Sequence, residues 1–258
     1  MKFLAANVFN TTTQISIPAI GGGGTSTLAN LFDRNKDTLY ISDAAGTDAS
    51  TATLQITFSP TQTVSEISVK NINLRQYSIT TYNGGVAGGN INVSANTAIN
   101  RYAVISTIPV TTITVIMNTT ITANQQKQIG ELIISNLLYD FASDRLPSAG
   151  EYKSSIQKRQ IVHEMSDGGV SVYNVREKFS AQISLSFVPT STESSLRSVY
   201  SQSSAFIFVP FDTTTGWDGN LAEVAWIGPY EFYEFSDNNL GNGYQGQIEL
   251  RQTVGGKW

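Results

Sequence analysis

The chain has 258 residues, of which 40% are hydrophobic and only 14% are charged, and its formal net charge at pH 7 is −4. An acidic chain offers no basic surface to neutralise phosphates, so nucleic acid is excluded as the main partner. Cysteine is absent, which excludes disulfides and thiolate metal sites. No apolar stretch is long enough for a membrane helix, and the apolar residues before Asn7 are too few for a signal peptide, so no membrane partner is expected.

Alternating apolar and polar residues dominate the first half of the chain. Residues 54–58, 67–69 and 113–117 place apolar side chains two positions apart, so these side chains share one face of a sheet. Residues 77–82 run into Asn83-Gly84-Gly85, which tolerate positive φ angles. We therefore predict half-buried strands in this half and a hairpin at residues 83–85.

The alternation stops at residues 141–152, where Pro147, Ser148 and Gly150 cluster. Such residues favour irregular backbone, and segments of this kind separate domains. The sequence predicts a first domain at 1–140, a linker at 141–152 and a second domain at 153–258.

The second half opens with another hairpin signal, because Asp167-Gly168-Gly169 joins residues 161–165 to residues 170–175. Residues 179–187 alternate Phe, Ala, Ile, Leu and Phe with Ser and Gln, which predicts a long strand with one buried face. Residues 244–250 alternate in the same way. Residues 206–209 are apolar throughout and predict a buried strand.

One helix is predicted, at residues 191–202. Thr190 and Glu193 have the spacing of a capping box just after Pro189, and Leu196 and Val199 follow at helical spacing. The helix is expected to pack one face on the sheet. The predicted fold class is all-β, with two antiparallel β domains and this short helix.

No residue set in the sequence specifies catalysis. His163 is the single histidine, and no Gly-x-Ser-x-Gly elbow supplies a nucleophile for it. The glycine run at 21–24 lacks the residues that follow in a phosphate-binding loop. Four acidic residues crowd one region, where they are expected to cap turns or hold a cation: Asp33, Asp37, Asp43 and Asp48. We predict no catalytic residues and a protein that is not an enzyme.

Residues 31–40, Leu-Phe-Asp-Arg-Asn-Lys-Asp-Thr-Leu-Tyr, and residues 129–134, Ile-Gly-Glu-Leu-Ile-Ile, resemble motifs of the galactose-binding-like (discoidin or coagulation-factor C-type) β-sandwich family. The resemblance covers roughly residues 10–138 and implies a jelly-roll sandwich. Arg34 replaces the usual glycine and Tyr40 the usual tryptophan, and the family's paired cysteines are missing.

The resemblance also implies two kinds of site. In carbohydrate-binding members the early loop and the late glutamate often surround a structural Ca²⁺, which corresponds here to Asp33, Thr38 and Glu131. The alternative is a loop without metal, in which Asp33 caps a turn and Glu131 accepts from a backbone N–H. A sugar site would need an aromatic platform, for which four tyrosines are available and none is singled out: Tyr40, Tyr77, Tyr82 and Tyr102.

The second half resembles, in layout only, the β modules of bacteriophage tail tubes, including distal tail and baseplate-hub components. This resemblance implies a non-enzymatic structural protein of a phage tail or baseplate, assembled in the host cytoplasm. Its partners would be further copies of the chain and other virion proteins. The alternative function is a carbohydrate-binding module that recognises a host cell-surface glycan.

Overall fold

A computed structural model describes the chain at residues 1–9, 15–16, 25–42, 48–141, 151–165, 168–202, 205–210, 221–237 and 241–253. The chain divides into two compact bodies. Leu4–Leu137 make up most of the N-terminal body. The C-terminal body contains Met1–Phe3, Leu138–Phe208 and Ala222–Gly255. The glycine run at 21–24, Asp43, most of the predicted linker and the C-terminal residues 254–258 lie outside the described residues.

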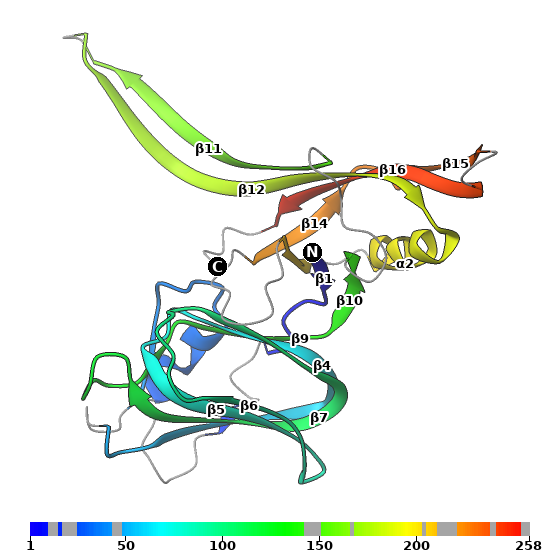
Figure 1. Ribbon diagram of the computed structural model, residues 1–258. Coiled ribbons are helices and arrows are strands. Elements are labelled where there is room, and N and C mark those ends of the chain that lie inside the picture. The colour runs from blue at the N-terminus through cyan, green and yellow to red at the C-terminus, as the bar shows by residue number, and fades with distance from the viewer. Residues whose placement is uncertain are drawn as a thin grey trace. The chain divides into compact units, whose positions relative to one another are not determined.

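The N-terminal body is built almost entirely from strands (Figure 1). Its elements are β2 (Ile15–Ser16), the 3-10 helix η2 (Thr25–Leu31), β3 (Tyr40–Ile41), β4 (Ala52–Lys70), β5 (Leu74–Asn83), β6 (Val86–Val93), β7 (Arg101–Thr120), β8 (Gln128–Ile129) and β9 (Glu131–Ser135). Six of them form one sheet in the order β2-β4-β7-β5-β6, with β9 on β4, and β3 pairs with β8.

Two long strands give this body its two layers. The first half of β4 pairs with the second half of β7, which also carries β5. The second half of β4 pairs with the first half of β7 and with β9. The register shifts between Thr57 and Gln62, where the strand bends from one layer into the other. The predicted apolar faces at 54–58 and 113–117 are buried in the core between the layers.

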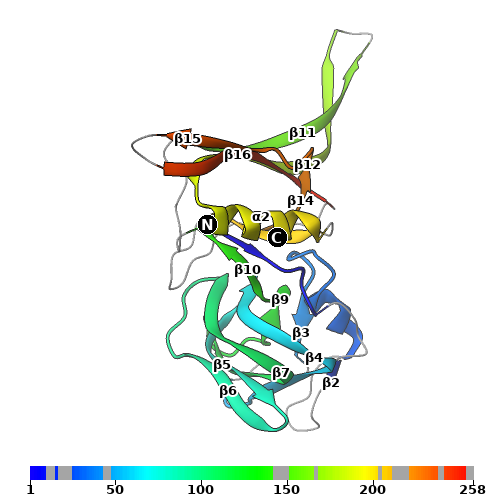
Figure 2. The ribbon, with the colours of Figure 1, turned by 90° about the vertical axis from the view of Figure 1, so that its right-hand side faces the viewer.

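The C-terminal body is an eight-stranded sheet with one α-helix in its described part. It contains β1 (Lys2–Leu4), β10 (Leu137–Asp140), β11 (Tyr152–Glu164), β12 (Val170–Val188), α2 (Thr190–Ser201), β13 (Phe206–Val209), β14 (Ala222–Ile227), β15 (Phe232–Asp237) and β16 (Gly241–Gln252). The strand order is β10-β1-β13-β14-β16-β12-β11, with β15 on β16. Figure 2 shows α2 lying along one face of this sheet.

The all-β class, both hairpins and the helix are confirmed. Gly84 and Gly85 have positive φ in the turn between β5 and β6, and β11 pairs with β12 on either side of Gly168. The helix spans Thr190–Ser201, but no side chain caps its N-terminus. The predicted capping box is therefore wrong, and Glu193 instead accepts hydrogen bonds from the guanidinium of Arg197 one turn later.

One residue of the predicted strand at 179–187 is misplaced. Ala181, Ile183 and Leu185 are buried as expected, but Phe187 is 44% exposed and Val188 takes the next core position. The cause is a register shift between Leu185 and Val188, at which Phe187 adopts a φ of 59°. An extra residue in a strand reverses the alternation beyond it.

Candidate functional site

Residues 33–38 form a loop held together by its own polar groups. Asp33 Oδ1 accepts a hydrogen bond from the Asn35 backbone N–H at 2.8 Å, and Asp33 Oδ2 accepts one from the Thr38 hydroxyl at 2.6 Å. The same hydroxyl lies 2.7 Å from the Asn35 carbonyl oxygen. Because a hydroxyl has one hydrogen, it donates to only one of these oxygens at a time. Carboxylate, hydroxyl and carbonyl oxygens therefore converge in this loop.

The loop keeps a backbone conformation that glycine adopts most easily. Arg34 has a φ of 64°, in the left-handed region where a Cβ is unfavourable. The family motif that residues 31–40 resemble has glycine at this position, and Arg34 takes the conformation that glycine would serve. The replacement of the motif's glycine by Arg34 therefore leaves the turn of the loop unchanged.

Close packing fixes the loop against the start of β9. Asn71 Nδ2 donates to the Lys36 carbonyl at 2.8 Å, and the Gly130 N–H donates to the Lys70 carbonyl at 2.9 Å. A Cβ added to Gly130 would overlap the Lys36 carbonyl oxygen. The missing side chain at Gly130 therefore allows the loop to reach the next residue, Glu131.

Glu131 is a buried carboxyl group in an unfavourable environment. It is 1% exposed, and no hydrogen bond of standard geometry reaches either of its oxygens. Burial, and secondly the negative charge of Asp33, raise its pKa to about 9, while the backbone N–H groups of Arg34 and Asn35 act in the opposite direction. A carboxyl group in this position either holds a proton or needs a cation.

These residues fit the predicted calcium site in type. Ca²⁺ prefers carboxylate, hydroxyl and carbonyl oxygens, and Asp33, Thr38 and Glu131 supply the first two beside the carbonyls of the loop. In the described part of the chain no three His, Cys, Asp or Glu side chains gather into a metal-binding group. A cation at this loop would therefore depend on neutral oxygens for much of its coordination, and its presence stays a prediction.

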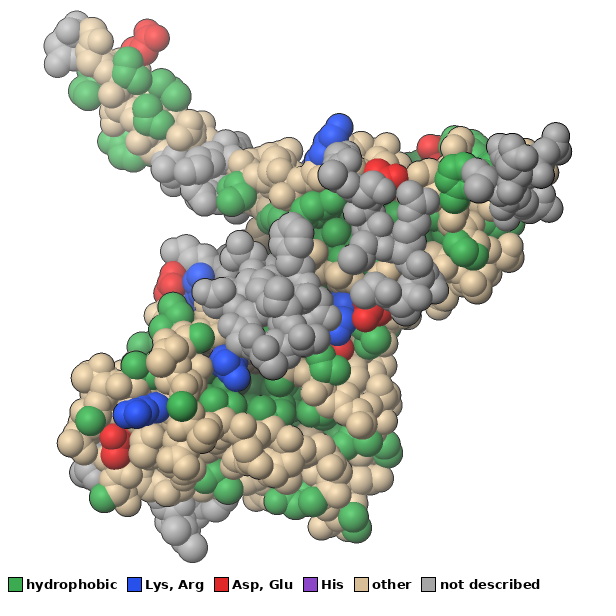
Figure 3. Space-filling model, in the orientation of Figure 1, with side chains coloured by type: hydrophobic (Ala, Val, Ile, Leu, Met, Phe, Trp, Pro, Cys, Tyr) green, Lys and Arg blue, Asp and Glu red, His purple; other side chains and the backbone are tan. Residues whose placement is uncertain are grey.

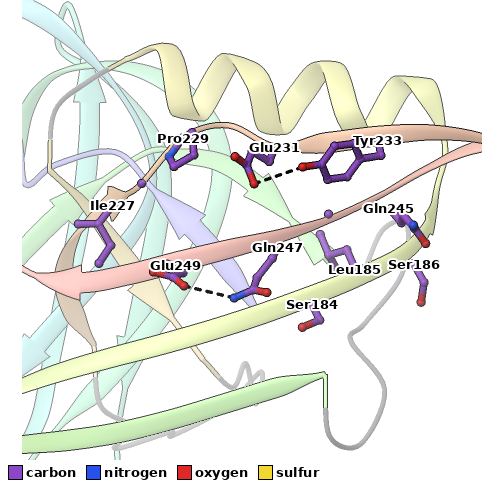
Figure 4. A pocket seen from close by; sticks show the side chains of 12 residues that line it. Ser184, Leu185, Ser186, Ile227, Pro229, Glu231, Tyr233, Gln245, Gln247 and Glu249 are labelled. Atoms are coloured by element: carbon purple, nitrogen blue, oxygen red, sulfur yellow. Dashed lines mark hydrogen bonds between the residues drawn. The ribbon is translucent and has the colours of Figure 1, made fainter.

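A groove of about 490 Å³ lies on the C-terminal body, between β12, β14, β15 and β16 (Figure 4). The pairing of β15 with β16 shapes this groove, and in it Phe232 of β15 lies opposite Gly246 of β16. A Cβ on Gly246 would come within 2.6 Å of the Glu231 carbonyl oxygen and 2.7 Å of the Phe232 ring. Glycine at this position lets β15 approach β16 closely.

Polar side chains line the groove. Tyr233 donates from its hydroxyl to Glu231 Oε2 at 3.4 Å, and Gln247 Nε2 donates to Glu249 Oε1 at 3.3 Å (Figure 4). Ser184 lies on the neighbouring strand β12. Among the described residues that line the groove there are two carboxylates and no Lys or Arg.

The groove continues into a smaller hollow of about 230 Å³ that shares Ile227 and Glu249 with it. This second hollow is lined in part by two cationic side chains, Lys153 from β11 and Arg251 from β16. The two hollows form one strip on the sheet, acidic at the β15 end and mixed in charge at the β11 end.

The tyrosines considered for a sugar platform do not provide one in the N-terminal body. Tyr40, Tyr77 and Tyr102 are buried, and Tyr82 is half-buried. Tyr233, in contrast, is 62% exposed at the groove. Sequence reasoning missed it, although the run Tyr-Glu-Phe-Tyr-Glu-Phe at 230–235 places Glu231 and Tyr233 two residues apart and hence on one face of a strand.

The other candidates for chemistry lie apart from both sites. His163 is exposed on β11, with its ring centroid 5.8 Å from that of Tyr173. Asp48 accepts hydrogen bonds from the backbone N–H and the hydroxyl of Thr120, whereas Asp33 binds Thr38. The described acidic residues near the N-terminus therefore serve separate local structures. No described helix is long and apolar enough to cross a membrane.

No protein-family model matches the chain, and no curated protein sequence matches it. Solved structures with a similar arrangement include a mutant of chitosan-binding module 1 from a chitosanase/glucanase of Paenibacillus sp. IK-5, which is 12% identical with a TM-score of 0.41. The alignment covers 51% of this chain and 99% of that one.

The family 32 carbohydrate-binding module of C. perfringens NanJ, solved with galactose, is 18% identical with a TM-score of 0.40, covering 52% of this chain and 99% of that one. A fucose-binding module of Streptococcus pneumoniae, SpX-3, is 10% identical with a TM-score of 0.39, covering 50% and 96%. Likenesses at this level identify no ligand and no binding residue of this chain.

Proposed function

We propose that this chain is a non-catalytic carbohydrate-binding protein and that the groove between β12, β14, β15 and β16 is its glycan site. The observation that carries this proposal is the exposed ring of Tyr233 beside the carboxylates and amides of the same groove. The apolar face of a sugar ring stacks on an aromatic side chain. Sugar hydroxyls donate to carboxylates such as Glu231 and Glu249, and they accept from amides such as Gln247.

The shape and openness of the groove favour binding over cleavage. Each carboxylate already accepts a hydrogen bond from a neutral neighbour, Glu231 from Tyr233 and Glu249 from Gln247. A glycosidase needs one carboxyl group kept protonated by a water-poor environment and a second one placed across the scissile bond. Glu231 and Glu249 instead line an open sheet face, which suits reversible contact with an extended glycan.

The carbohydrate-binding proposal agrees with the kind of protein that the N-terminal sequence motifs resemble. The structures named above are described as binding chitosan, galactose and fucose, and they are non-catalytic modules, but they do not identify the sugar for this chain. The proposal therefore rests on the residues of the groove. The experiment tests variants in both the C-terminal and the N-terminal body.

The test is a glycan array with the intact chain, followed by titration calorimetry on any glycan that binds. Tyr233→Ala is expected to weaken binding at least roughly tenfold, since it removes the stacking ring. Glu249→Gln is expected to weaken binding while keeping the shape of the groove. Tyr82→Ala in the N-terminal body is the matched control and is expected to bind like the wild type.

Two results would count against the proposal. Absence of binding to every glycan on the array would remove the function. Loss of binding in Tyr82→Ala, with Tyr233→Ala unaffected, would move the site to the N-terminal body.

The role in a phage tail or baseplate stays a prediction from the layout of the second half of the sequence. None of the structures named above is a virion protein.

A further inference from the structure

The two hollows on the C-terminal body follow the outward face of β12. Strand alternation buries every second side chain of β12 in the same core as the apolar side chains of α2: Ala181, Ile183 and Leu185. The side chains between them point to the opposite face and line the hollows: Ser180, Gln182, Ser184 and Ser186. Three of these four are serines, so the floor of the strip is low.

Long polar side chains of β16 border this floor. They occupy every second position of the strand and are all exposed: Gln245, Gln247, Glu249 and Arg251. Strand pairing sets Gln247 opposite Ser184 in the larger hollow and Arg251 opposite Ser180 in the smaller one. In Figure 4 the labelled residues of β12 and β16 follow the two strands side by side. The sheet is hollowed here because short side chains face long ones across the ladder.

The strip is long compared with a single sugar unit. From Gln245 to Arg251 a strand at about 3.4 Å per residue advances about 20 Å. Ile227 and Glu249 line both hollows, so the hollows meet at these two side chains. A pocket for one small ligand encloses most of that ligand. This strip instead offers polar contacts in a row, which suits a chain of several sugar units.

The charges along the strip balance. Its described lining residues include two acidic side chains, Glu231 and Glu249, and two basic ones, Lys153 and Arg251. A polyanion would meet the two glutamates, and a polycation would meet Lys153 and Arg251, so either polymer meets like charges. The face of the C-terminal body seen in Figure 3 also shows few charged side chains, of both signs. A neutral chain avoids this repulsion.

We propose that the strip binds the interior of a linear, neutral glycan chain, with successive sugar units in the two hollows. This binding mode depends on the proposed function of the groove and extends it to the smaller hollow. Tyr233 stacks on a unit in the larger hollow, while Gln182 and Arg251 contact the hydroxyls of units farther along. Glutamine both donates and accepts hydrogen bonds, and arginine donates them, so a sugar hydroxyl finds a partner in either role.

The first experiment measures affinity against chain length. Cello-, xylo-, manno- and N-acetylated chito-oligosaccharides of one to six units are titrated into the intact chain by calorimetry. In a series that binds, affinity is expected to rise at least roughly tenfold from two units to five. Equal affinity for two and five units would overturn the extended binding mode and leave the proposed function intact.

Absence of binding to all four series would also overturn the extended binding mode. The glycan array then separates the two proposals. Another glycan bound on the array keeps the proposed function, whereas an array without any bound glycan removes both.

The second experiment tests the smaller hollow by substitution. Tyr233→Ala is expected to weaken short and long oligomers alike. Gln182→Ala is expected to weaken five-unit binding at least roughly tenfold and to leave two-unit binding unchanged. A structural defect would instead weaken both lengths. Gln76→Ala, at an exposed glutamine of β5 in the N-terminal body, is the matched control and should bind like the wild type.

Arg251→Gln provides an independent variant at the same end of the strip. It should show the length dependence of Gln182→Ala, and Arg75→Gln, at an exposed arginine of β5, is its control. If both strip variants leave five-unit binding unchanged, or if both weaken the two lengths equally, the smaller hollow does not contact the glycan and the extended binding mode is wrong.

Discussion

Asp33 and Glu131 are two carboxyl groups nearly a hundred residues apart in the sequence, and the charge of the first helps to raise the pKa of the second to about 9. Burial contributes more to this shift than Asp33 does. Two ionised carboxylates in this arrangement would repel each other. The protonation state of Glu131 should therefore depend on pH and on any cation bound beside it.

Without a bound cation, the stability of the chain should fall as pH rises. Glu131 has a pKa of about 9 in the folded chain and an ordinary value of 4.5, so between these values the folded state holds a proton that the unfolded state has released. Each pH unit in this window then costs about 1.4 kcal/mol of the free energy of unfolding. Below the ordinary value both states are protonated, and the full contribution of the proton is retained.

Urea unfolding in EDTA at about pH 5 and about pH 8 checks this expectation. Glu131→Gln cannot ionise, so its stability relative to the wild type should improve between the two pH values. Equal pH dependence of the two proteins would show that Glu131 does not hold a proton in the folded state.

If Asp33, Thr38 and Glu131 bind Ca²⁺, the ion should oppose the loss of stability at high pH. A cation keeps the Glu131 carboxylate ionised, so added Ca²⁺ should raise the Tm of the wild type near pH 8 and reduce the fall in stability with pH. Asp33→Asn and Glu131→Gln should each lose most of that increase. A chelator that leaves the Tm unchanged, together with absence of metal in elemental analysis, would contradict the site.

Strands and turns could be predicted because their signals are local. Leu54, Ile56 and Phe58 alternate within a few residues, and Gly84 and Gly168 have the positive φ that their turns require. The groove could not be predicted in this way. Tyr233 lies opposite Gln245 because β15 and β16 pair in one register, and Glu249 enters the groove farther along β16, opposite Ile227 of β14. No local pattern specifies which strands become neighbours.

Phe187 shows how a local pattern fails. Its alternation with Leu185 predicts burial, yet the bulge places Val188 in the core and leaves Phe187 in edge-to-face contact with Phe235, with ring centroids 4.8 Å apart. A bulge depends on how β12 pairs with β16, and the sequence of β12 alone does not contain that information.

Substitutions at these two positions test the bulge. Phe187→Gly should change the free energy of unfolding by no more than about 1 kcal/mol, because relief of the left-handed backbone offsets the lost ring contact. Val188→Ala should cost roughly 1–3 kcal/mol, since it leaves a cavity in the core. A loss of about 3–5 kcal/mol for Phe187→Gly, the size expected for a core phenylalanine, would show that the bulge is absent in solution.

Gly246→Ala should disturb the groove without touching its polar side chains. The new Cβ would meet the Glu231 carbonyl oxygen and the Phe232 ring, so β15 must move away from β16, and overpacking of this kind costs roughly 1–3 kcal/mol. The displaced strand carries Tyr233 and directly follows Glu231, so glycan binding should weaken and the Tm should fall. Ser184→Ala, on the opposite wall, removes a single hydroxyl and should leave Tm close to the wild type. If Gly246→Ala binds glycan with unchanged affinity, the wall formed by β15 does not contribute to the site.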